Sequence, residues 1–261
     1  MTYKLLFLDI DGTILKPDHT YSASTKEAIA EVKEQGVEVF LATGRPLHEV
    51  KELAEELDVQ SFVGYNGAFG IYQDETIINE PLKESTIKEF LRLAKEHNHE
   101  LVCYTSEKNY FTSLTHPKVQ QFIDIFNLKW NEALTEDVVS GILGATVMNL
   151  KPEDVALYEE VADIHLSQVN VEDVKHGYDI IRKSVNKGVA VQRIMDRLNV
   201  KKEQTIAFGD GMNDKEMLQA VGEGFAMGNC APELLPYSKH QTTTVTESGI
   251  ANGLKQLVLL K

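Results

Sequence analysis

Two aspartates stand two residues apart near the start of the chain. Asp9 and Asp11, in the stretch FLDIDGT, directly follow an apolar run. Side chains alternate along a strand, so both carboxylates can lean to the same side, and Gly12 lets the backbone turn immediately afterwards. Two like charges this close repel, and a hard divalent cation between them relieves the cost; ligands that are all oxygen favour Mg²⁺ over zinc. The alternative is an exposed acidic turn that caps the next segment.

A hydroxyl and a glycine follow a second apolar run. Thr43 and Gly44, within LATGRP, precede a helix expected to begin near Pro46, and this arrangement can hold an anion. Arg45 comes directly after them and could meet the same anion, with a surface salt bridge as its alternative. Taken alone, a Thr-Gly pair is more often only a turn.

A lysine and a second acidic motif complete the candidate groups. Lys187 lies at the start of an apolar helix, the unfavourable end for a cation by the helix dipole, and its alternative is simple exposure to solvent. The stretch FGDGMND supplies Asp210 directly after an apolar run, with Asn213 and Asp214 one turn further on. A helix cap is the alternative for Asp214. Together, the four loops suit one cation and one phosphate, and a single site explains them better than four coincidences.

These groups need strands that end at one edge of a sheet. Apolar runs predict strands at residues 3–9, 37–44 and 61–65. Helical spacing covers residues 24–35 and 46–57, with Ser24 as the expected cap of the first helix and Gly36 at its end. This alternation predicts a parallel sheet with right-handed crossovers, whose carboxyl ends carry the chemistry.

The pattern changes after Pro81 and resumes at Lys187. Between them we expect helices at 85–98, near 116–126 and at 152–161, and short strands at LVCYTS, NYFTS, ATVMNL, IHLSQVNV and YDIIRK. These elements indicate a compact α+β unit at about residues 83–183. After it we expect a helix at 187–198, a strand at 204–211, a helix from Asn213, the strand GFAMG, a helix from Ala231, the strand TTTVT and a last helix. The predicted fold is therefore α/β, a Rossmann-like core of residues 1–82 plus 184–261 with an inserted α+β domain at 83–183.

Composition limits the possible partners. The 261 residues carry 26 Lys and Arg against 40 Asp and Glu, a net charge of −14, which argues against nucleic acid and anionic membrane surfaces as partners. No signal peptide and no run of 18 apolar residues is visible, so we expect a cytoplasmic protein. Cys103 and Cys230 are expected to be reduced structural thiols.

Four motifs in this order resemble the haloacid dehalogenase-like (HAD) superfamily, and more closely its Cof-like branch, in which a type IIB (C2) cap follows the third strand. They are DIDGT at 9–13, ATGR at 42–45, NKG at 186–188 and GDGMND at 209–214, and the resemblance covers the whole chain. The segment at 66–68, Asn-Gly-Ala, resembles the family's lead into the cap. The chain departs from the family's usual pattern at Asp179, where glutamate is common, and at Ser184, where glycine is frequent.

The resemblance implies a role for each motif residue. Asp9 would be the nucleophile that forms an aspartyl-phosphate, and Asp11 would protonate the leaving oxygen and then deprotonate the attacking water. The groups that would hold the phosphoryl oxygens are Thr43, the Gly44 amide, Lys187, Asn213 and backbone N–H groups near Ile10. The Mg²⁺ ligands would be Asp9, the main-chain carbonyl of Asp11 and Asp210, with Asp214 supporting the metal or orienting Lys187.

We therefore expect a Mg²⁺-dependent phosphatase of a small soluble phosphomonoester, a sugar phosphate or a phosphorylated cofactor, acting as a monomer or homodimer. The inserted domain would select the leaving group, with Tyr104 and Tyr178 among its candidate contacts. A phosphomutase on the same scaffold is the enzymatic alternative. A phosphorylation-dependent signalling domain is the alternative from another class, although Asp11 and a domain of about 100 residues have no purpose in a simple receiver.

Overall fold

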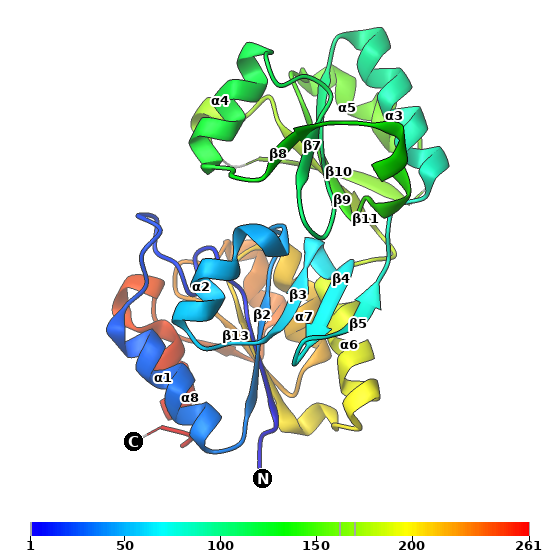
Figure 1. Ribbon diagram of the computed structural model, residues 1–261. Coiled ribbons are helices and arrows are strands. Elements are labelled where there is room, and N and C mark those ends of the chain that lie inside the picture. The colour runs from blue at the N-terminus through cyan, green and yellow to red at the C-terminus, as the bar shows by residue number, and fades with distance from the viewer. Residues whose placement is uncertain (1, 162, 170, 261) are drawn as a thin grey trace. The chain divides into compact units, whose positions relative to one another are not determined.

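The computed structural model describes residues 2–161, 163–169 and 171–260 (Figure 1). Contacts divide the chain into two compact units. The core unit comprises the residues up to Arg45, Lys51–Ile78 and those from Asn186 onward, and the inserted unit comprises Pro46–Val50 and Asn79–Val185. Within the described residues, none of the helices has the length and apolar character needed to cross a membrane.

The core unit is built on an eight-stranded sheet, which confirms the predicted α/β class. Its strand order is β14-β13-β12-β1-β2-β3-β4-β5. The bounds are β1 Leu5–Leu8, β2 Glu38–Ala42, β3 Ser61–Gly64, β4 Phe69–Tyr72, β5 Glu75–Asn79, β12 Thr205–Gly209, β13 Glu223–Ala226 and β14 His240–Gln241. β1 is central and parallel to both neighbours, with Leu6 opposite Val39 and Ile206. The β3–β4 pair is antiparallel.

Helices cover both faces of this sheet because successive strand residues point to opposite sides. The helices are α1 Ala23–Glu34, α2 Lys51–Glu56, α6 Lys187–Leu198, α7 Lys215–Ala220 and α8 Gly249–Gln256. Ala207 of β12 packs with Ile194 and Met217 of the α6–α7 pair, and the next residue, Phe208, lies against Gly253 of α8. Figure 1 shows α8 beside α1.

Several predicted boundaries within residues 22–57 are wrong. Ser22, not Ser24, caps α1 by accepting from the Thr25 N–H, while Gly36 (φ 81°) follows the helix as expected. The helix expected at 46–57 is split into a 3-10 turn, Leu47–Glu49, and α2, because Val50 lies between them with ψ of 2°.

The C-terminal part of the core unit differs from expectation in three places. A 3-10 turn, Met212–Asp214, precedes α7. The helix expected from Ala231 is a 3-10 turn, Pro232–Tyr237, since Pro236 has no N–H to continue an α-helix. The stretch TTTVT is not a strand; β14 ends at Gln241, and Val245–Glu247 forms another 3-10 turn.

The inserted unit carries a six-stranded sheet in the order β10-β11-β9-β6-β7-β8. Its strands are β6 Glu100–Tyr104, β7 Asn109–Phe111, β8 Asn131–Ala133, β9 Gly144–Met148, β10 Ile164–Gln168 and β11 Tyr178–Arg182. Its helices are α3 Glu84–His97, α4 Pro117–Phe126 and α5 Val155–Glu159. β8 was not predicted, and the helix expected at 152–161 is shorter because its first turn, Pro152–Asp154, is 3-10.

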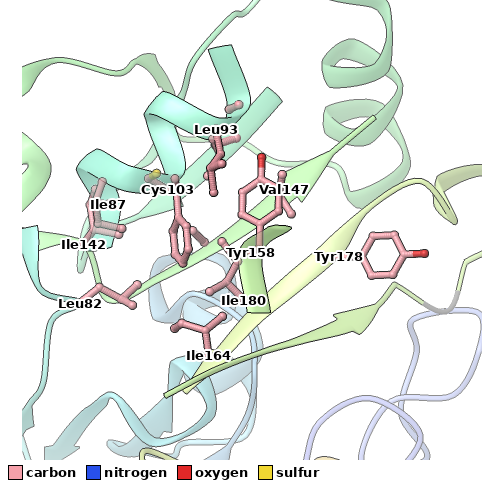
Figure 2. Packing of buried hydrophobic residues seen from close by; sticks show 14 of the residues in the cluster. Leu82, Ile87, Leu93, Cys103, Ile142, Val147, Tyr158, Ile164, Tyr178 and Ile180 are labelled. Atoms are coloured by element: carbon pink, nitrogen blue, oxygen red, sulfur yellow. The ribbon is translucent and has the colours of Figure 1, made fainter. Parts of the chain in front are cut away.

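Each face of the inserted unit's sheet has its own apolar cluster. Figure 2 shows Tyr158 of α5 and Leu93 of α3 packing with strand residues such as Val147. On the opposite face, Val102 and Met148 pack with residues of α4. Cys103 is buried, and burial raises its pKa to about 12, so that its thiol stays protonated.

Candidate active site

Three motif residues follow adjacent strands of the core sheet. Asp9 comes directly after β1, Thr43 after β2 and Asp210 after β12. Because β2 and β12 flank β1 in parallel, the loops that leave their carboxyl ends share one edge. The sequence therefore placed these groups correctly relative to one another.

A buried lysine connects two of the acidic motifs. Lys187 is the first residue of α6, behind the cap Asn186, and its side chain is fully buried. Its Nζ donates to Asp9 Oδ1 and to Asp214 Oδ1, both at 2.6 Å. Burial alone would lower the lysine pKa, but Asp214 and Asp9 outweigh it and hold the pKa above its usual value. The alternative of an exposed lysine is thus wrong, and the cation stays charged.

Asp214 has two structural tasks. Its Oδ1 accepts from Lys187, while its Oδ2 accepts from the backbone N–H groups of Asp210 (3.0 Å) and Gly211 (3.1 Å). The carboxylate is fully buried, and each oxygen has a charged or backbone donor. It fixes the lysine and the loop after β12 at the same time, so that both the cap and the lysine-orienting interpretations describe part of what it does.

The acidic residues form a cluster whose chemistry fits a divalent cation. Asp9, Asp210 and Asp214 each offer an oxygen within 4.8 Å of the other two. Burial and the neighbouring Asp214 raise the pKa of Asp9 well above its usual range, and the same two causes raise that of Asp210 to about 6. One lysine against three carboxylates leaves an excess of negative charge, which a hard cation on oxygen ligands would offset.

Asp210 is held closely by the loop after β1. Thr13 donates its hydroxyl to Asp210 Oδ1 (3.3 Å), and Asn229 donates to Oδ2 (3.4 Å). Gly12 has φ of 83°, and a Cβ built on it would lie 2.1 Å from Asp210 Oδ2. Gly12 is therefore required both for its backbone conformation and for the space that the carboxylate occupies.

The expected anion-binding groups gather around an asparagine. Thr43 is buried, and its carbonyl accepts from the Asn66 N–H (3.1 Å). Asn213 donates its amide to Asn66 Oδ1 at 3.1 Å, and a Cβ on Gly44 would lie 3.1 Å from the Asn66 side chain. Asn66 adopts φ of 53° and ψ of 32°, a left-handed conformation that asparagine tolerates better than most residues.

Asp11 and Ile10 occupy different environments in the same loop. Asp11 is exposed, with 50% of its side chain accessible, and its Oδ2 accepts from Arg45 Nε at 2.7 Å. Arg45 thus forms the salt bridge that was its alternative, here with Asp11 of the motif. Ile10 is fully buried, and its carbonyl accepts from the N–H groups of Ile14 and Leu15, which folds the loop back on itself.

Three residues with contacts in this site were not predicted from the sequence. Thr13 and Asn229 contact Asp210, and Asn66 contacts Asn213. Thr13 is part of the DIDGT motif, and the Asn-Gly pair at 66–67 is a signal for positive φ. Asn229 has no such signal, because its contacts depend on loops far apart in the sequence.

The inserted unit has a hydrogen-bonded polar network on one face of its sheet. Thr146 Oγ1 donates to Asp179 Oδ1 at 2.6 Å and therefore accepts from the Tyr104 hydroxyl at 2.9 Å, since one hydroxyl has one proton. Thr146 is buried, Tyr104 half-buried and Asp179 exposed. Their strand neighbours Cys103 and Ala145 point into the apolar cluster formed with α3 and α5. Because successive strand residues point to opposite faces, the network lies on the face of the sheet opposite to that cluster. Tyr178, another candidate contact, packs in that cluster and is not part of the network.

Comparison with known proteins gives relatives that align over the full length. A family model of haloacid dehalogenase-like hydrolases matches residues 6–254. YkrA of Bacillus subtilis, whose assignment as a phosphatase is provisional, is 34% identical over 100% of both chains. YitU of the same organism, a 5-amino-6-(5-phospho-D-ribitylamino)uracil phosphatase, is 32% identical over 97% of this chain and 96% of its own.

A solved structure shows the same fold. BT1666 of Bacteroides thetaiotaomicron, a phosphatase of the HAD superfamily, has a TM-score of 0.86 at 23% identity, covering 99% of this chain and 96% of its own. The chain therefore belongs to the haloacid dehalogenase-like hydrolase family, which confirms the resemblance drawn from its four motifs. Within that family it is an enzyme of the phosphatase class.

Proposed function

We propose that the enzyme is a Mg²⁺-dependent phosphatase that hydrolyses a small phosphomonoester through an aspartyl-phosphate on Asp9. The observation that carries this proposal is the buried Lys187 shared by Asp9 and Asp214, with Asp210 within reach of both carboxylates. Phosphoryl transfer depends mainly on positioning and on neutralising the charge of the equatorial oxygens. A permanent cation beside a buried carboxylate at the end of a strand meets both needs.

Asp9 is oriented for attack by its contact with the lysine. Lys187 binds Oδ1, which leaves Oδ2 to form the bond to phosphorus. The pKa of Lys187 is held above its usual value, so the ammonium group stays charged beside the attacking carboxylate. Thr43, the Gly44 amide, Asn213 and backbone N–H groups near Ile10 would hold the other oxygens.

Asp11 moves the proton in both steps. It gives a proton to the leaving oxygen when Asp9 attacks, and it takes one from the water that hydrolyses the aspartyl-phosphate. The Arg45–Asp11 ion pair is partly exposed, with side-chain accessibilities of 34% and 50%. Exposed pairs contribute at most about 1 kcal/mol, so Arg45 can exchange Asp11 for a substrate anion at little cost.

The metal ligands follow from the cluster of carboxylates. Asp9, Asp210 and the main-chain carbonyl of Asp11 would hold Mg²⁺, which neutralises charge on the phosphoryl group when bound. Asp214 supports this set indirectly, because its oxygens already accept from Lys187 and from the Asp210 and Gly211 N–H groups.

Residues 83–183, which make up most of the inserted unit, would be the cap that selects the leaving group. Its network presents the exposed carboxylate of Asp179 and the Tyr104 ring on one sheet face. A carboxylate accepts hydroxyl protons well, so we propose a hydroxyl-bearing leaving group, as in a sugar or polyol phosphate or a phosphorylated cofactor. The ribityl phosphate named for YitU is of this chemical type.

A screen of phosphorylated metabolites with Mg²⁺ tests this proposal, with Asp11→Asn as the control. Release of phosphate from small hydroxyl-bearing esters is expected for the natural chain and is expected to fall sharply for the variant. Turnover in ¹⁸O-labelled water should place solvent oxygen in the phosphate. Phosphate transfer to a second sugar without the label would indicate a phosphomutase instead.

The setting of the reaction is also part of the proposal. The net charge of −14 disfavours nucleic acid as a partner, and we propose a cytoplasmic enzyme, a monomer or homodimer, whose partner is its small-molecule substrate. Size measurement in solution and cell fractionation test these points.

A further inference from the structure

Asn229 is an exposed residue in the segment that follows β13, and its amide joins three separate loops. Its Nδ2 donates to the Gly12 carbonyl at 2.8 Å and to Asp210 Oδ2 at 3.4 Å. Its Oδ1 accepts from the Val245 N–H at 2.8 Å. The loops after β1 and β12 are thus connected, through one side chain, to the segment that follows β14.

These partners define the orientation of the amide. Gly12 offers a carbonyl and Asp210 a carboxylate, which only accept, whereas the Val245 N–H only donates. A reversed amide would set its oxygen against two acceptors and its NH₂ against a donor. Aspartate at this position could still accept from the Val245 N–H, but it would set its other oxygen, with a negative charge, against the two acceptors. Asparagine is therefore the side chain of this length that satisfies all three partners.

The backbone around Asn229 is itself fixed. The Met227 N–H donates to the Gly209 carbonyl (3.0 Å), and the Ala231 N–H donates to the Asp210 carbonyl (3.1 Å). On its other side, the Gly228 N–H donates to the Thr243 carbonyl (3.0 Å). Asn229 thus projects from a segment held on both sides, and its amide can restrain the position of its partners in the other loops.

The partners it determines are those of the proposed reaction. Gly12 follows Asp11 directly, so a bond to the Gly12 carbonyl restrains the loop that carries Asp9 and Asp11. Asp210 receives one donor on each oxygen, Thr13 on Oδ1 and Asn229 on Oδ2. Removal of Asn229 would take the donor from Oδ2 and leave the carboxylate held by Thr13 on Oδ1 alone, with more freedom to rotate.

We infer that Asn229 is a positioning residue of the active site, which holds the loop after β1 and the Asp210 carboxylate in register through its oriented amide. This inference rests on the proposed function for its effect on Mg²⁺ and catalysis. Its effect on the loop is independent of that function. The residue acts through Gly12 and Asp210 and is not itself placed against the substrate or the reacting atoms.

The test compares Asn229→Ala with Asn252→Ala, each against the natural chain. Asn252 donates its amide to Thr243 Oγ1 and to the Glu247 carbonyl, both at 2.9 Å, so it braces the same C-terminal loop without reaching Gly12 or Asp210. It therefore controls for a general loss of packing near residues 243–247.

Three readouts are measured on both variants. Hydrogen exchange in the metal-free protein reports on the amides of Gly12, Ile14 and Leu15, which bond within the loop after β1. Calorimetric titration with Mg²⁺ alone gives the metal affinity, and steady-state kinetics on p-nitrophenyl phosphate give kcat and KM separately.

For Asn229→Ala we expect faster exchange, about tenfold weaker Mg²⁺ binding and a comparable fall in kcat, with little change in KM. A tenfold effect is typical of losing a hydrogen bond to a charged group. For Asn252→Ala we expect none of these.

The outcomes separate the inference from the proposed function. If Asn229→Ala has the same exchange rates, Mg²⁺ affinity and kcat as the natural chain, the positioning role of Asn229 is overturned while the proposed function stands. Equal changes in Asn229→Ala and Asn252→Ala would overturn that role as well. A natural chain that neither binds Mg²⁺ nor hydrolyses phosphomonoesters would overturn the proposed function. The exchange comparison in the metal-free protein would then still decide whether Asn229 positions the loop.

Discussion

The core unit and the inserted unit are both sheets covered by helices, but they use buried polar groups in opposite ways. In the core unit, full charges are buried together, with Lys187 between Asp9 and Asp214. In the inserted unit, the buried member of the network is a neutral hydroxyl, Thr146, and its charged partner Asp179 is exposed. Burying a charged group costs free energy, so charged groups are buried where the reaction needs them. Exposed polar groups on a sheet face carry no such cost and can be suited to a particular ligand.

The largest effect is expected from removing the nucleophile. Asp9→Asn replaces the attacking carboxylate with an amide, and we expect hydrolysis of p-nitrophenyl phosphate to fall at least about 10⁴-fold, as for other covalent catalysts. Asp18→Asn is the control, since Asp18 is exposed and its bonds among the described residues are to its neighbours Thr20 and Lys16. Full Mg²⁺-dependent activity in Asp9→Asn would refute the assignment.

The next effect concerns the stability of the core unit. Lys187→Met leaves two buried carboxylates without their cation, and we expect a loss of about 3–5 kcal/mol in the free energy of unfolding, measured by urea denaturation without metal. Lys33→Met removes a surface pair with Asp58 and should cost no more than about 1 kcal/mol. Equal losses in the free energy of unfolding for the two variants would mean that Lys187 does not stabilise the buried carboxylates.

A smaller effect is expected in the inserted unit, and it should depend on the substrate. Asp179→Asn weakens the acceptor of the polar network, and we expect KM for a hydroxyl-bearing phosphoester to rise about tenfold while p-nitrophenyl phosphate is unaffected. Glu132→Gln, at an exposed pair with Lys108, is the control in the same unit. A change shared by both substrates would assign Asp179 to folding rather than selection.

The smallest effect is a dependence of stability on pH. Burial and Asp214 raise the pKa of Asp210 to about 6 from 3.8, so the folded metal-free protein binds this proton more tightly than the unfolded chain. The associated stability is present below pH 4 and is lost as the pH rises through 6. Mg²⁺ should therefore raise Tm more at pH 7.5 than at pH 5, by about 2–4 °C. The same rise at both values would contradict a metal site at Asp210.

Local sequence signals were sufficient for the core sheet and its strand-end residues. Apolar runs that end in Asp9, Thr43 and Asp210 gave the parallel order and therefore the common edge of their loops. Family membership and the phosphatase class were also correctly anticipated from the motifs. The roles of the individual residues stay predictions.

Other features were decided by contacts that local sequence does not contain. Both Ser22 and Ser24 have side chains that could cap α1. In the structure Ser22 accepts from the Thr25 N–H, while Ser24 donates its hydroxyl to Ser248, a residue far away in the sequence. TTTVT has strand-forming residues, but Thr244 and Glu247 form a capping box that turns the chain. Asn229 could not be found from sequence, because its hydrogen-bond partners belong to three loops that come together only in the folded chain.

The transfer of a phosphoryl group to Asp9 and its release with the help of Asp11 can be followed with Asp11→Asn and p-nitrophenyl phosphate. This leaving group needs no proton, so the first step should proceed while hydrolysis is blocked. We expect a burst of one p-nitrophenolate per enzyme and, after acid quenching, a peptide that carries phosphate on Asp9. Unchanged steady turnover without a burst, or phosphate on a different residue, would contradict this mechanism.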